Sequence, residues 1–313
     1  MKEYFTDTST RMIRFRDDID HELMMSCISE FSQRYPNLEI TYIGESMLGR
    51  GIPMITLGKG SREAIYIGAH HGMESITSAV LLTFINDYCE NLKGNVKIYG
   101  SHARSIDEAV RIHIIPMLNP DGVDYSVNGV SEDNILYERL ISMNSGNTDF
   151  TNWQANARGV DLNHNYDAGF YEYKKIEYES GIMCGGPTRF SGEWPESEPE
   201  VGFLCNYMRF NENISVALTL HSQGEEIYYT SVGESNSSYA SIAKIIGNKT
   251  GYRVEEPEGM AAYGGFTDWC ISKLNKPSFT IECGKGKNPL PISDYFSIYT
   301  KLREILYRIP LMV

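Results

Sequence analysis

The chain has 313 residues, of which 42% are hydrophobic and 22% charged, values that are ordinary for a soluble globular protein. Lys and Arg together number 28 against 41 Asp and Glu, so the formal net charge is −13. This acidic balance argues against nucleic-acid phosphates or an anionic membrane surface as the main partner.

The six cysteines are scattered and form no Cys-x-x-Cys pair, so they indicate neither a zinc ribbon nor a need for disulfides. The first residues carry acids and lack an apolar run, and no signal peptide is visible. No stretch approaches the length of apolar residues that a membrane span requires. We therefore expect a cytoplasmic protein with no membrane association and no obligate protein partner.

Hydrophobic periodicity and turn residues predict the elements of the first part of the chain. In order, these are a helix over 18–35, strands at 38–44 and 52–57 that form a hairpin, a strand at 64–69, a helix over 74–90, a loop at 93–103 and a strand at 111–117. Residues 123–200 show little periodicity and many Gly, Asn, Tyr and Pro. A long irregular segment of this kind is more often a binding loop than a linker.

The last third of the chain returns to clear periodicity. It predicts a helix over 198–211, a strand at 214–220, helices over 237–250 and 264–275, a strand at 278–283 and a closing helix over 293–309. Strands and helices alternate without repeats or charge runs. We expect one α/β domain over 1–313, with a mixed, mostly parallel central sheet covered by helices on both faces.

Three of the predicted strands end in titratable groups. The first delivers His71 and, three residues later, Glu74, the second delivers His221, and the third contains Glu282. Parallel strands bring their carboxyl ends together, so these groups are candidates for one site. Two His and one carboxylate are the ligand set of a catalytic zinc ion, and a second Glu can take a proton from the zinc-bound water. Taken singly, each is more often a satisfied core His or a Glu at a turn.

Two features of the sequence keep this interpretation open at the level of residues alone. A second His-x-x-acid spacing occurs at His164 and Asp167. The run that ends the first strand also contains two adjacent histidines, His70 and His71. Spacing alone does not show which of the two His-x-x-acid pairs binds a metal, nor which of the two adjacent histidines is the ligand.

Six segments in order resemble one known family. They are His71-Gly-Met-Glu74, Asn119-Pro-Asp-Gly122, Gly159-Val-Asp-Leu-Asn163, the Ser-Glu-Pro-Glu run at 197–200, His221-Ser222, and Gly264-Gly-x-x-Asp-Trp269 ahead of Glu282. Over about residues 40–285 the chain resembles the zinc carboxypeptidases of the carboxypeptidase A type.

The resemblance implies a reaction and assigns roles to residues. It implies one Zn²⁺ per chain, held by His71, Glu74 and His221, with His71 rather than His70 as the ligand. It makes Glu282 the general base and proton shuttle in the hydrolysis of an amide bond. The implied partner is a small peptide substrate.

The chain departs from the family where the substrate's terminal carboxylate is held. The family has arginines at the positions of Met73, Gln154 and His164 and a tyrosine at that of Met260. Loss of a bidentate arginine is not a conservative change, so an ordinary carboxypeptidase that acts on free C-termini is disfavoured.

Of the family's anion clamp, Asn163 alone remains. The candidate replacement donors are Arg158 and His164, and sequence does not choose between them. Tyr263 either reaches the site from the same loop as Met260 or only packs there. With Gln154, these are the predicted substrate-binding residues.

The bacterial γ-D-glutamyl-L-diamino-acid peptidases, which cut peptidoglycan stem peptides, tolerate such departures. They also resemble this chain over the run from Trp153 to Asn163. This is our leading hypothesis. The alternatives are an N-acyl amino acid deacylase of the aspartoacylase type and a zinc-binding homologue that no longer catalyses.

Overall fold

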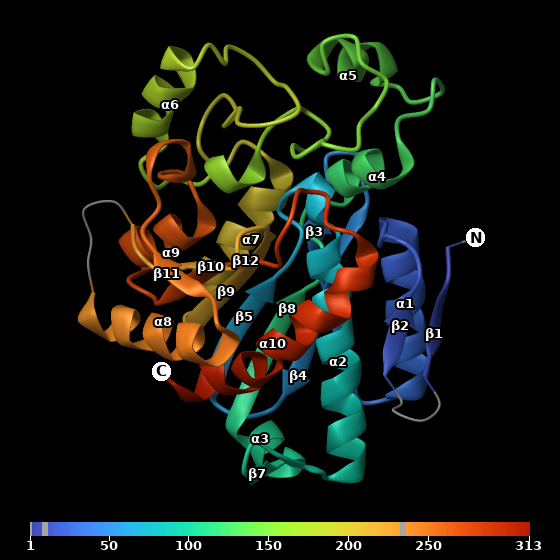
Figure 1. The fold of residues 1–313 in the computed structure, drawn as a ribbon, viewed down its shortest axis with the longest axis vertical. Helices are drawn as coiled ribbons and strands as arrows, with labels where there is room; N and C mark the ends of the chain where they lie inside the picture. Colours follow the sequence, from blue (N-terminus) through green and yellow to red (C-terminus); the bar gives the residue numbers. More distant parts are fainter. Residues whose placement is uncertain (1, 8–11, 232–235) are drawn as a thin grey trace.

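A mixed eight-stranded sheet lies at the centre of the computed structural model, which describes residues 2–7, 12–231 and 236–313 (Figure 1). The strand order is β11-β10-β12-β9-β5-β8-β4-β3. The bounds are β3 (Glu39–Glu45), β4 (Gly51–Gly58), β5 (Arg62–Ile67), β8 (Val110–Ile115), β9 (Ile214–Ser222), β10 (Glu226–Tyr228), β11 (Arg253–Glu255) and β12 (Ser278–Cys283).

The four central strands, β12, β9, β5 and β8, are parallel. Of the predicted metal ligands, His221 lies in β9, and His71 and Glu74 follow the end of β5. Antiparallel pairings join β10 to β12, β4 to β8 and β3 to β4, while β11 is parallel to β10. The predicted mixed, mostly parallel sheet is confirmed. The short strands β10 and β11 were not predicted, because three residues are too few to show a period.

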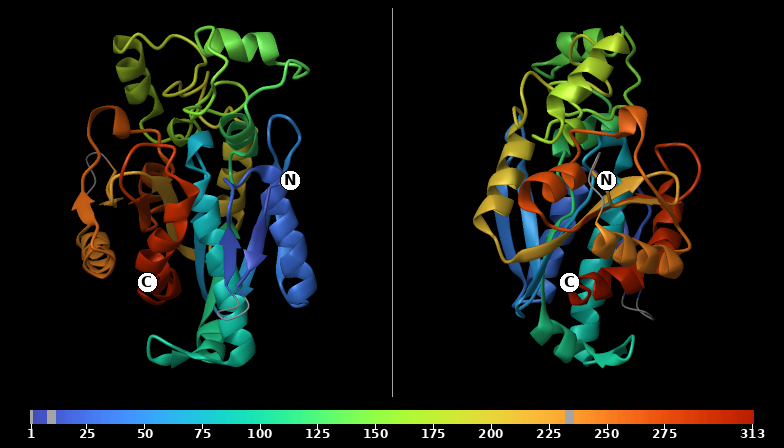
Figure 2. Two further views of the ribbon diagram at one scale, coloured as in Figure 1. Left: turned by 45° about the vertical axis from the view of Figure 1, so that its right-hand side comes forward. Right: turned by 90° about the vertical axis from the view of Figure 1, so that its left-hand side faces the viewer.

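Helices cover both faces of the sheet (Figure 2). One face packs against α1 (His21–Arg34), α2 (Ile76–Gly94), α8 (Ser237–Thr250) and α10 (Tyr295–Arg308). The other packs against α7 (Pro199–Phe210) and α9 (Phe266–Leu274). Side chains of a strand point alternately to the two faces, so in β5 Tyr66 joins the first apolar cluster and Ile65 and Ile67 the second. A strand buried on both faces therefore reads as a continuous apolar run.

The segment predicted as an irregular loop forms a cap above the carboxyl ends of the central strands, drawn in green to yellow in Figure 1. It contains three short helices that were not predicted, α4 (Pro120–Asn128), α5 (Tyr137–Met143) and α6 (Phe170–Glu179). Its own small apolar cluster includes Tyr125, Phe150 and Trp153. Helices of at most ten residues, fewer than three turns, bury too short a stripe to stand out in the sequence.

Smaller elements complete the described chain. The hairpin of β6 (Lys97–Ile98) and β7 (Ser101–His102), with α3 (Ala103–Ala109), replaces the loop predicted at 93–103. A separate pair, β1 (Tyr4–Thr6) and β2 (Ile13–Phe15), lies beside α1. The 3₁₀ helices are η1 (Gly72–Glu74), η2 (Leu162–His164), η3 (Gly259–Ala261), η4 (Ile292–Asp294) and η5 (Ile309–Leu311). Among the described residues, no helix is long and apolar enough to cross a bilayer.

A buried carboxylate joins α2 to α10. Asp87 accepts hydrogen bonds from the hydroxyls of Tyr299 at 2.7 Å and Tyr307 at 3.1 Å. The guanidinium of Arg303 donates to the same side chain at 2.7 Å. Three donors from one helix thus depend on one acceptor from the other, and both helices cover the same face of the sheet.

We expect Asp87→Ala to lower the free energy of unfolding by about 2–4 kcal/mol, because it leaves two buried hydroxyls and a partly buried cation without their acceptor. Asp87→Asn keeps one acceptor oxygen and is expected to cost less. Urea denaturation measures both. Equal midpoints for wild type and the Ala variant, at unchanged slope, contradict the role given to Asp87.

Candidate active site

Close backbone packing positions the first metal-ligand candidates. Gly72 lies against the cap: a Cβ at this position would come within 2.4 Å of the carbonyl oxygen of Gly122. The side chain of Asn119 accepts from the amide of Gly122 at 2.9 Å and donates to the carbonyl of His70 at 3.0 Å. The Asn-Pro-Asp-Gly turn therefore caps α4 and at the same time holds the segment that carries His71.

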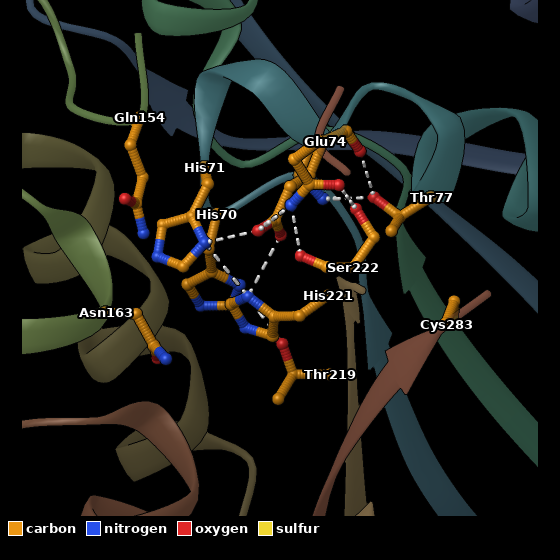
Figure 3. A network of polar contacts seen from close by, with 12 residues as sticks. His70, His71, Glu74, Thr77, Gln154, Asn163, Thr219, His221, Ser222 and Cys283 are labelled. Atoms are coloured by element: carbon orange, nitrogen blue, oxygen red, sulfur yellow. Dashed lines mark hydrogen bonds and ion pairs between the residues drawn. The ribbon is translucent and has the colours of Figure 1, made fainter. Parts of the chain in front are cut away.

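His71, Glu74 and His221 converge at the carboxyl ends of β5 and β9 (Figure 3). The Nδ1 of His71 lies 2.9 Å from one carboxylate oxygen of Glu74, and the Nδ1 of His221 lies 3.1 Å from the other. The two Nδ1 atoms are 3.2 Å apart. All three side chains are buried. Two imidazole nitrogens and a carboxylate that face one point are the donor set that suits Zn²⁺, so these residues fit the metal that the sequence predicts.

Asp161 forms the outer contact of this cluster. Its carboxylate lies 3.2 Å from the Nε2 of His71, on the side of the ring away from Glu74. A carboxylate that bonds the second nitrogen of a ligand His fixes the orientation and tautomer of the ring. Asp161 lies in the Gly159–Asn163 segment, and its contact with His71 was not predicted from the sequence.

The histidines and carboxylates of the cluster shift one another's pKa values. Burial alone lowers the pKa of His71, but the carboxylates of Glu74 and Asp161 outweigh it and raise that pKa well above its usual value. Burial alone raises the pKa of Glu74, and the nearby His71 and His221 bring it down to about 2. Burial keeps the pKa of His221 low, so this imidazole is neutral and has a lone pair to give.

His70 is turned away from this point. Its Nδ1 lies 3.1 Å from the hydroxyl of Thr219 and its Nε2 lies 2.9 Å from the hydroxyl of Tyr166, so both ring nitrogens are engaged. Its ring stacks on His221 with 5.2 Å between the centroids. His70 therefore supports a ligand rather than joining the ligand set.

Glu282 lies near the end of β12, where it is in register with His221 on the neighbouring parallel strand. Residues in register on adjacent strands project from the same side of the sheet. Burial and the nearby Glu74 raise the pKa of Glu282 well above its usual value. A carboxylate with a raised pKa is suited to hold a proton and pass it on.

His71, Glu74, Asp161 and Glu282 line a cavity of about 450 Å³ beneath the cap. Its walls come from the cap, from the ends of β5, β9 and β12, and from η3 and α9. The residues that line it are His71, Met73, Glu74, Gln154, Asp161, Asn163, His164, Thr188, Arg189, Ser222, Gln223, Tyr228, Thr230, Pro257, Glu258, Met260, Ala261, Gly265, Thr267, Asp268, Thr280, Glu282 and Asn288.

Three of the predicted substrate-binding residues line this cavity. The side-chain oxygen of Asn163 accepts from the amide of Phe266 at 3.1 Å, which leaves its NH₂ group for a ligand. His164 is held by a 3.0 Å contact between its Nδ1 and the carbonyl of Tyr263, and its ring stacks on Tyr173. Gln154 lies on the same wall.

The structure places the other two outside the cavity lining. Arg158 is 3.8 Å from the carboxylate of Glu198, within the cap. The ring of Tyr263 covers Gly169, so it packs there, and only its carbonyl contacts a cavity residue. The side chains of Arg158 and Tyr263 are therefore not assigned a contact with the substrate.

Sequence reasoning did not identify three further residues of the cavity wall. Asp268, in α9, is buried beside the cavity, and the Gly264–Trp269 segment that contains it does not indicate this position. Asn288 contacts Ser222 and lies 3.5 Å from Glu74, and Arg189 enters from the cap. The last two come from loops without periodicity, and only the fold shows that they reach the site.

Comparison with known proteins agrees with this geometry. The family model described as zinc carboxypeptidase matches residues 24–304. The γ-D-glutamyl-L-diamino acid endopeptidase 1 of Lysinibacillus sphaericus is 32% identical over 289 residues, which cover 92% of this chain and 71% of that protein.

Two solved structures share the fold. Bovine thrombin-activatable fibrinolysis inhibitor superposes with a TM-score of 0.70 at 20% identity, covering 94% of this chain and 97% of that one. The murein-tripeptide amidase of Escherichia coli O157 gives 0.55 at 19% identity, covering 86% and 91%. The resemblance inferred from the motifs is confirmed, and the chain belongs to the zinc carboxypeptidase family of metallopeptidases.

Proposed function

We propose that this chain hydrolyses the γ-D-glutamyl–diamino acid bond of peptidoglycan peptides, with one Zn²⁺ held by His71, Glu74 and His221. The observation that carries the proposal is a buried His–Glu–His cluster beside Glu282, in a cavity whose lining has methionines where the family's carboxylate clamp has Arg and Tyr. The similarity to an endopeptidase of this specificity supports the same substrate class.

The residues of the site divide the chemistry between them. Zn²⁺ in such a site acts as a Lewis acid on the scissile carbonyl and lowers the pKa of a water molecule. Glu282, half-buried near the metal ligands, accepts the proton of the attacking water and delivers it to the leaving amine. Asp161 keeps His71 in the orientation that presents Nδ1.

The cavity favours a diamino acid on the leaving side. Asp268 is buried in its wall, and one of its carboxylate oxygens has no hydrogen-bond partner among the residues that the structure describes. Burial raises the pKa of Asp268 to about 7. An ammonium group of the substrate beside this carboxylate favours its ionised form, since an opposite charge offsets the cost of burial. The second amine of a diamino acid is such a group.

The rival activities have weaker support. The family match describes a carboxypeptidase rather than a deacylase. A zinc-binding protein without activity has no use for a carboxylate such as Glu282 at the metal ligands. The cytoplasmic location stays a prediction, which cell fractionation tests.

Muramyl tri- and tetrapeptides, incubated with the zinc-loaded protein, test the substrate class. We expect cleavage between D-Glu and the diamino acid, identified by the masses of the products. A hippuryl-type dipeptide serves as the carboxypeptidase control and is expected to be a poor substrate, because Met73 and Met260 offer no donors to its terminal carboxylate. Cleavage of the dipeptide alone contradicts the proposal.

Glu282→Gln is expected to lower kcat by about 10²–10⁴-fold, because the amide cannot accept the proton of the attacking water. Bound zinc, measured by atomic absorption, is expected to stay at the wild-type level. Glu255→Gln, an exposed change on β11, is the matched control and is expected to be fully active. A wild-type kcat for the Glu282→Gln variant would show that Glu282 is not the general base.

His71→Ala is expected to abolish stoichiometric zinc binding, because it removes one of three protein ligands. His70→Ala is the matched comparison: it breaks the contacts with Thr219 and Tyr166 and lowers the thermal midpoint, but the ligand set stays complete. Dialysis against a zinc buffer followed by metal analysis separates the two. Zinc retained by His71→Ala and lost by His70→Ala reverses the assignment.

A further inference from the structure

One cation faces the cavity among the residues that the structure describes. Arg189 is the single Lys or Arg side chain in the described lining. The acids of the same lining are Glu74, Asp161, Glu258, Asp268 and Glu282. A positive group in an otherwise acidic cavity is a specific place for a negatively charged part of a ligand.

The backbone of Arg189 is held in an uncommon conformation. Its φ is +67°, in the left-handed region that residues with a side chain rarely adopt. Its amide donates to the buried carboxylate of Asp161 at 3.2 Å, and its carbonyl accepts from the hydroxyl of Tyr173 at 3.0 Å. Two contacts thus fix a strained residue at the cavity wall, a combination that is typical of functional sites.

The guanidinium group has no protein partner in the described structure. The side chain is exposed, and no hydrogen bond or ion pair of the described residues involves it. Other arginines nearby differ: Arg158 lies beside Glu198, and Arg209 pairs with Glu196. An unpaired guanidinium keeps its fork of donors for a carboxylate.

Arg189 and Asp268 enter the cavity lining from different parts of the fold. Asp161 contacts both His71 and the Arg189 amide, so Arg189 belongs to the cap wall next to the metal ligands. Its neighbour Thr188 donates to Gln154, on the same wall. Asp268 comes from α9, on the other side of the sheet from α2. A ligand carboxylate is attracted to the guanidinium of Arg189 and repelled by the ionised carboxylate of Asp268.

We propose that Arg189 binds a free carboxylate on the acyl side of the scissile bond, and so selects γ-linked glutamyl substrates. The inference rests on the proposed function. A γ-linked glutamyl residue is joined through its side-chain carboxyl, so its α-carboxylate remains free beside the acyl group. An α-linked neutral residue has no charge there. Arg189 is thus a specificity-determining residue that enters from the cap, in a chain with Met73, Gln154 and His164 at the family's arginine positions.

Two substrates and three variants test the proposal. The substrates are L-Ala-γ-D-Glu-diaminopimelate and the same peptide with 4-aminobutyrate in place of D-Glu, which lacks only the acyl-side carboxylate. We expect wild type to prefer the first by about 10- to 100-fold in kcat/KM, the range for a charge-assisted hydrogen bond. Arg189→Gln is expected to lose this preference by slowing on the first substrate alone. Arg189→Lys keeps the positive charge and is expected to retain part of the preference for the first substrate.

Arg139→Gln, an exposed arginine change on α5 of the same cap, is the matched control and is expected to keep the wild-type preference. An equal loss on both substrates in Arg189→Gln, at an unchanged thermal midpoint, overturns the selectivity role. Equal wild-type rates on the two substrates also overturn it, while the proposed function stands. If wild type cleaves neither γ-linked substrate, the proposed function fails first, and the inference fails with it.

Discussion

The structure depends on a compensated burial of charge. Glu74 and Asp161 are buried carboxylates and Glu282 is a half-buried one near them, and isolated burial of such groups is very costly. Here His71 stands between two of them, with one ring nitrogen toward Glu74 and the other toward Asp161. The 3₁₀ turn at Gly72–Glu74 and the cap segment that carries Asp161 must therefore be placed together, because His71 contacts both carboxylates.

Local patterns predicted the central elements, because each of them has a strong physical cause. Strands β5, β9 and β12 are buried on both faces and appear as apolar runs, and the polar residue that ends each run marks the site. The choice of His71 over His70 did not follow from spacing. It needed the family resemblance, and the structure supplies the physical reason: Thr219 and Tyr166 occupy both nitrogens of His70.

The substrate end of the cavity was harder to predict for a different reason. Its walls come from loops and short helices of the cap, where a residue's role depends on where the chain turns rather than on a period. Arg158 and Arg189 lie in the same stretch of sequence, and nothing local distinguishes them. In the fold, Arg158 contacts Glu198 inside the cap, whereas Arg189 reaches the cavity. Tyr263 shows the same limit, since its ring covers Gly169.

The distance along the chain between the two histidines has a consequence for folding. His71 and His221 lie 150 residues apart in sequence, yet their Nδ1 atoms are 3.2 Å apart. Their meeting requires β9 to pair with β5 after the whole cap has been enclosed as a loop, and contacts of such high sequence separation form slowly. A nascent chain that has not yet reached β9 contains His71 and Glu74 but no complete site, so the hydrolytic centre is absent until most of the sheet exists.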